Sequence, residues 1–208
     1  RHGAAGDSRF VDGAVVPLDC WTKDYAKLQG ASTAIARASF QGGAAVPDYI
    51  DHRRDKLEGP SRNQRSVGAG TAVALASAID QALIANGTAA SVSALQLWAR
   101  APRPNLGAIV SASMGKGIAT EPTLPWDEAL ACKWAAPEAA RLCKAGEKGK
   151  APTLEEVGKA EQAPFARLDD VVELDGTNGD WLRDTLARKQ DVVVVLRVDP
   201  DAWKSVVK

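Results

Sequence analysis

The side chains best suited to chemistry in this chain of 208 residues are two histidines and three cysteines. His2 and His52 are too few for a histidine-rich metal site, and any histidine that activates a serine or cysteine must be one of these two. No two of the three cysteines, Cys20, Cys132 and Cys143, have CxxC spacing, which excludes a zinc ribbon and a thioredoxin-type redox motif. Cys132 and Cys143 are close enough in sequence to form a disulfide in an oxidising compartment, and three free thiols are the alternative. These residues indicate no metal site and no cofactor.

The clearest secondary-structure element in the sequence is a helix predicted at residues 71–85. Its apolar side chains cover most of the circumference, which is typical of a helix buried at the centre of a domain. An Asn-Gly pair follows it as a helix-ending signal. Further along, residues 166–174 and 191–198 are predicted strands and residues 178–189 a helix. Helices that come first and strands that come later predict an α+β fold.

Composition excludes two classes of partner. Lys and Arg number 26, as do Asp and Glu, so the formal net charge is zero and no sustained basic field attracts nucleic acid. No stretch approaches the roughly 20 apolar residues of a membrane span. The chain begins at Arg1, which we interpret as the mark of a processed or trimmed product.

Several short motifs occur in an order that resembles the papain-like cysteine peptidases. Residues 46–53 (VPDYIDHR) resemble the family's PxxxDWR segment, with His52 in place of the tryptophan. Residues 61–74 (SRNQRSVGAGTAVA) resemble NQGxCGSCWAFS, and the helix that follows reaches an acidic residue, Asp80, as in the family. Three later segments resemble the family's LSxQxL motif, its GIxxExxYPY motif and its late helix and strand: residues 92–97, 117–126 and 178–198.

The resemblance implies a two-lobe papain-like fold. Residues 47–208 would form the papain-like domain, with residues 47–150 as a mainly helical lobe around a long central helix. Residues 151–208 would begin a β-rich lobe that is incomplete in this chain. Residues 1–46 would be an N-terminal extension, either propeptide-like or packed on the surface.

Transferred residue by residue, the resemblance leaves no complete catalytic machinery. Gly70 occupies the position of the nucleophilic cysteine, where the helix dipole and a histidine partner would lower the pKa of a thiol. The family's histidine and asparagine follow the strand matched by residues 191–198, and the chain contains no histidine after His52. Gln64 matches the residue whose amide helps form the oxyanion hole, and the alternative is that it hydrogen-bonds the loop. The residues expected to line a groove that binds but does not cleave are Gln64, Gly68, Gly70 and Thr71.

Hydroxyl groups near the missing thiol are poor substitutes for it. Ser66 and Thr71 need an adjacent base to become nucleophilic at neutral pH. The resemblance places His52 in the segment before the loop and not across the groove, so we expect no catalysis by either hydroxyl.

The favoured hypothesis is therefore a catalytically inactive papain-like pseudopeptidase that acts in binding or scaffolding. Its partner would be a protein or peptide, with a second chain that completes the β-rich lobe as one form of it. Two alternatives are a fragment or altered form of an active cysteine peptidase, which hydrolyses peptide bonds, and an unrelated α+β binding domain. The resemblance implies a secreted or periplasmic protein, and the alanine-rich helices favour a bacterial source.

Overall fold

The computed structural model describes residues 49–137, 139–140, 143, 150–169, 171–173 and 179–194, and the backbone of three short strands nearer the N-terminus. The described part combines helices with short strand pairs, so the predicted α+β class is confirmed. Its helices are α2 (Gly70–Ala85), α3 (Ala94–Arg100), α4 (Leu106–Ser113), α5 (Glu128–Trp134), α6 (Leu154–Gln162) and α7 (Gly179–Ala187).

The strands of the described part pair in twos. The antiparallel pairs are β1 (Ser8–Val11) with β2 (Ala14–Pro17) and β4 (Gly117–Ile118) with β5 (Ala166–Arg167). The parallel pair is β3 (Ala36–Arg37) with β6 (Val172–Glu173). This last pair connects the expected N-terminal extension to the segment that precedes α7.

Two predictions about strands are wrong in the described residues. The strand expected at residues 166–174 is split into β5 and β6, because the two pieces pair with different partners. The strand expected at residues 191–198 is absent over residues 191–194, and residues 195–198 lie outside the described part. The backbone N–H of Asp191 donates instead to the side chain of Gln81 on α2 (3.3 Å), so it is not available to a neighbouring strand.

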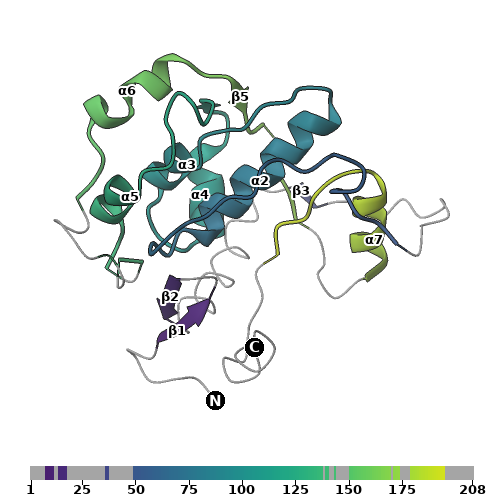
Figure 1. Cartoon of the computed structure of the whole chain (residues 1–208), viewed down its shortest axis with the longest axis horizontal. Coiled ribbons are helices and arrows are strands. Elements are labelled where there is room, and N and C mark those ends of the chain that lie inside the picture. The colour runs from purple at the N-terminus through teal and green to yellow at the C-terminus, as the bar shows by residue number, and fades with distance from the viewer. Residues whose placement is uncertain are drawn as a thin grey trace.

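Helix α2 occupies the position that its sequence predicts. It spans 16 residues and ends at the expected Asn-Gly signal, where Gly87 has a φ of +83° that suits glycine. Small buried side chains such as Ala72 and Ala76 let α2 pack against α3 and α4, whereas α7 lies on the other side of α2 from α5 and α6 (Figure 1). Within the described residues, no helix has both the length and the apolar character needed to cross a membrane.

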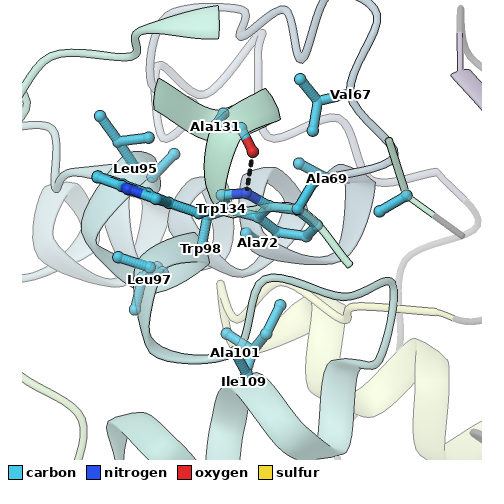
Figure 2. Close-up of a cluster of buried hydrophobic side chains, with 14 of the residues drawn as sticks. Val67, Ala69, Ala72, Leu95, Leu97, Trp98, Ala101, Ile109, Ala131 and Trp134 are labelled. Atoms are coloured by element: carbon cyan, nitrogen blue, oxygen red, sulfur yellow. Dashed lines mark hydrogen bonds between the residues drawn. The ribbon is translucent and has the colours of Figure 1, made fainter. Parts of the chain in front are cut away.

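The hydrophobic core lies between these helices and contains two tryptophans. The side chains of Trp98 on α3 and Trp134 on α5 are almost completely buried. Trp98 Nε1 donates a hydrogen bond to the backbone oxygen of Ala131 (3.0 Å), which joins α3 to α5 (Figure 2). Ala69 and Ala72, at the start of α2, pack in the same cluster, so the N-terminus of α2 is anchored in the core.

A disulfide joins Cys132 on α5 to Cys143, as the sequence spacing allowed. The two cysteines are 11 residues apart, so the bond restricts a short loop in the unfolded chain. We expect the double variant Cys132→Ala/Cys143→Ala to lose about 2–3 kcal/mol of unfolding free energy in urea titrations. Reductant should lower the stability of the wild type to the value of the double variant and leave the variant unchanged. Equal effects of reductant on both proteins would contradict this prediction. The third cysteine, Cys20, lies outside the described residues.

Helix α6 begins with a complete capping box, which is coupled to a salt bridge. The Thr153 hydroxyl accepts from the Glu156 backbone N–H, and the Glu156 carboxylate accepts from the Thr153 N–H. The same carboxylate is paired with the ammonium group of Lys133 on α5. The Lys133 hydrogen bond first, and then that of the Thr153 N–H, lower the pKa of Glu156 from 4.5 to about 2.

This low pKa makes part of the stability depend on pH. Because the pKa of Glu156 is lower in the folded than in the unfolded state, its contribution is complete above about pH 4.5 and is lost as the pH falls toward 2. We expect the difference in urea midpoint between wild type and Glu156→Gln to be largest near pH 6 and to shrink steadily by pH 3. Glu155→Gln, on the exposed side of the same turn, serves as the control. A difference that does not vary with pH would disprove the coupling.

Candidate functional site

The candidate site lies where the loop of residues 61–69 leads into α2. Gly68 is buried, and its N–H donates to the backbone oxygen of Ala139 (3.0 Å). A Cβ on Gly68 would lie 3.3 Å from the Ala139 Cα, so glycine permits this close approach of two backbones. Gly68 therefore holds the loop in place from inside, and it does not face solvent as a groove residue would.

Gly70 and Gln64 are brought together at the first turn of α2. Gly70 is exposed, whereas Gln64 is buried. A Cβ built on Gly70 would lie 3.1 Å from Gln64 Oε1, which is tighter than an ordinary van der Waals contact. The side-chain amide of Gln64 thus lies directly beside the position that a nucleophile at the helix tip would occupy.

Thr71 completes the set of expected groove residues. It is half-buried, and its Oγ1 is a buried atom that has no hydrogen-bond partner among the described residues. At the tip of the helix, the first N–H groups of α2 lack partners within the helix. Ala69, at the N-cap, supplies no side-chain hydrogen bond to them. The tip of α2 therefore brings together Gln64, Gly70 and Thr71. The buried Gly68 holds the preceding loop against the backbone of Ala139.

Ser66 has a proton acceptor close to it, which makes it the strongest rival nucleophile. Both its hydroxyl and its backbone N–H donate to Glu128 Oε1 at the start of α5. A carboxylate is ordinarily a base of pKa near 4, which is too weak to withdraw a serine proton at neutral pH. The contact fixes the loop to α5, and it does not amount to a nucleophile activated by a base.

A buried ion cluster fixes the loop from the other side. Arg62 Nη2 lies 2.6 Å from Asp80 Oδ2 on α2, and Arg62 Nη1 lies 3.0 Å from Glu121 Oε2. Asp80 is fully buried and also accepts from the backbone N–H of Val92 (2.7 Å), while Arg62 donates to the Val92 oxygen (2.8 Å). The cluster joins the loop, α2 and the segment before α3. The sequence indicates the position of Asp80, but no local pattern identifies Arg62 as its partner, because the two residues are brought together by the packing of the loop on α2.

His52 lies at the opposite end of α2 from Gly70. Its ring contacts Asp191 and the backbone oxygen of Leu186, and the same segment is bound by Gln81 on α2. Gln81 is eleven residues beyond Gly70, which corresponds to about 16 Å along the helix axis. His52 is therefore too distant to act as a base for any group at the helix tip.

The comparisons with known proteins place the chain in no family. No protein-family model matches it, and no curated protein sequence matches it significantly.

Proposed function

We infer that this chain is a papain-like pseudopeptidase, which binds a protein or peptide partner and does not cleave it. The observation that carries this inference is the pairing of Gly70 with Gln64. The residue at the tip of the long helix α2 has no side chain, and the side chain of Gln64 lies next to it through Oε1. Stabilisation of an oxyanion would require the Nε2 donor of the same amide.

The positions that resemble family motifs also meet one another in space, which supports the same inference. Arg62, in residues 61–74, binds both Asp80, in the helix that follows this motif, and Glu121, in residues 117–126. Gln96, from the VSALQL segment, accepts from the backbone N–H of Ala119 in the GIATEPTLPW segment (2.7 Å).

The inference predicts binding that depends on the candidate site, together with the absence of cleavage. Incubation of the full chain with a mixed peptide library, followed by mass spectrometry, should yield no new termini. A random-peptide display library should be enriched on the wild type and not on Gly70→Arg, whose long side chain would cover the exposed tip of α2. Gly158→Arg on α6, where a Cβ meets nothing within 4 Å, is the matched control and should retain the enriched peptides.

Each result bears on a different part of the inference. New termini that disappear in the Gly70→Arg variant would show an active enzyme and overturn it. Enrichment that is equal for the wild type and for Gly70→Arg would remove the tip of α2 as the binding site.

A further inference from the structure

Three side chains with metal-binding atoms meet beside the far end of α2. They are His52, Glu58 and Asp191, and one potential ligand atom of each lies within 4.8 Å of the others. They come from the turn before the loop of the candidate site and from the segment after α7. Neither the papain-like resemblance nor the proposed function gives these residues a role.

The imidazole of His52 is oriented as a metal ligand must be. Its side chain is only 5% exposed, and its Nε2 lies 3.0 Å from the backbone oxygen of Leu186. A carbonyl oxygen can only accept, so Nε2 carries a proton. Nδ1 faces the carboxylates and donates to Asp191 Oδ1 (2.6 Å), so a metal ion would displace this proton from Nδ1 when it binds. Metal-bound histidines commonly donate their other ring N–H to a carbonyl in this way.

The backbone holds the other two groups in place. The turn that carries His52 and Glu58 is closed by a hydrogen bond from the Leu57 N–H to the His52 oxygen (2.8 Å), and Leu57 is buried. On the other side, Gln81 accepts from the Asp191 N–H, and it also donates to the Lys189 oxygen at 2.5 Å. The cluster is thus held on both sides before any ion enters.

Negative charge is concentrated at this point. Partial desolvation of its carboxyl group, and then the charge of Asp191, raise the pKa of Glu58. Burial alone would lower the pKa of His52, but its hydrogen bonds to Asp191 and Leu186 outweigh burial and raise it. The positive charge of Arg53, on the same turn, acts to lower the pKa of Glu58, although Arg53 forms its ion pair with Asp51. A divalent cation would neutralise two carboxylates that otherwise repel each other.

We propose that His52 Nδ1 and the carboxylates of Glu58 and Asp191 bind a divalent transition-metal ion, with Zn²⁺ as the best match. One imidazole nitrogen and two carboxylate oxygens suit Zn²⁺, whose fourth position is left to water. Ligands of a tetrahedral Zn²⁺ lie roughly 3.4 Å apart, given bonds of about 2.0–2.2 Å. His52 Nδ1 and Asp191 Oδ1 are 2.6 Å apart and would separate slightly, while the exposed Glu58 would move inward.

The ion would join two distant parts of the chain. His52 and Asp191 are separated by 139 residues, so a shared ion would tie the segment after α7 to the turn that precedes the candidate site. Because the fourth position is left to water, the ion would exchange more readily than in a site closed by four protein ligands.

The test uses the full chain with Cys20→Ser and His2→Ala, so that neither residue can bind metal and His52 is the single remaining histidine. After treatment with chelator, Co²⁺ is titrated as a spectroscopic probe, and thermal unfolding is then followed with added Zn²⁺. We expect saturable visible Co²⁺ absorption, with one equivalent bound, and a higher Tm in Zn²⁺. Glu58→Gln should weaken binding at least about 10-fold. Asp55→Asn, an exposed carboxylate on the same turn, should change it less than about 2-fold.

The outcomes separate clearly. Absorption and a Tm shift that are lost in Glu58→Gln and kept in Asp55→Asn support the site. Absence of both signals up to millimolar metal would overturn it, as would equal binding by the two variants. A Tm increase with Ca²⁺ or Mg²⁺ but not with Zn²⁺ would also overturn it, because those ions do not require the imidazole.

Discussion

The Gly70→Cys variant should remain inactive, with hydrolysis of fluorogenic peptides no faster than in buffer. A thiol at the helix tip would have no histidine near it, because His52 contacts the segment that binds Gln81, and Gln81 lies about 16 Å from Gly70 along the axis of α2. Removal of the histidine from a triad costs on the order of 10⁶ in kcat, so a cysteine alone restores almost nothing. The new Cβ would also lie 3.1 Å from Gln64 Oε1, so the Gln64 side chain would have to shift by a few tenths of an ångström.

Alkylation kinetics check the same prediction independently. In a Cys20→Ala background, the rate at which the thiol of Gly70→Cys reacts with iodoacetamide should follow a single titration curve as the pH is raised. The pKa from this curve should be close to that of a free cysteine and lowered slightly by the helix dipole. Ser111→Cys, on the exposed side of α4, provides the reference thiol. Peptide turnover by Gly70→Cys that Ser111→Cys lacks, and that alkylation abolishes, would contradict the prediction that no base lies near the tip of α2.

Loss of Arg62 should be the most destabilising single change in the loop. Arg62→Met leaves Asp80, which is fully buried, and Glu121 without their cation. An uncompensated buried charge costs about 3–5 kcal/mol, so we expect a loss of that size in the free energy of unfolding, measured by urea titration. Arg54→Met, an exposed arginine of the preceding turn, should change it by less than about 0.5 kcal/mol.

A double-mutant cycle separates the ion pair from general damage to the loop. Arg62→Met/Asp80→Asn should cost clearly less than the sum of the two single variants, since the second change removes the charge that the first leaves buried. Additive losses would show that Asp80 and Arg62 do not interact energetically, despite their 2.6 Å separation.

The parts of the fold that depend on local pattern were predictable. The continuous apolar periodicity and the Asn-Gly signal predicted α2 to within one residue at its start, and the spacing of Cys132 and Cys143 allowed the disulfide that forms. The short helix at α7 also follows from its local sequence. Each of these three features depends on residues that are close in sequence, so the sequence alone is enough to predict it.

The strand predictions failed because a strand is completed by a partner that the sequence does not specify. Residues 166–174 have the composition of one strand, yet β5 and β6 pair with β4 and β3, which come from separate regions. The side-chain amide of Gln81 likewise takes the N–H of Asp191, 110 residues away, where composition predicted a strand. Local propensity is weak against contacts of this kind.

The sequence by itself determined that residue 70 is a glycine, that net charge is zero and that only two histidines exist, and these facts limit the chemistry. Only the tertiary structure decided that Gln64 lies against Gly70, that Arg62 gathers two carboxylates, and that His52 meets Asp191 far from the helix tip. The physical reason is that reactivity depends on distances of a few ångströms between side chains. Such distances are determined by how the whole chain packs, and no local pattern records them.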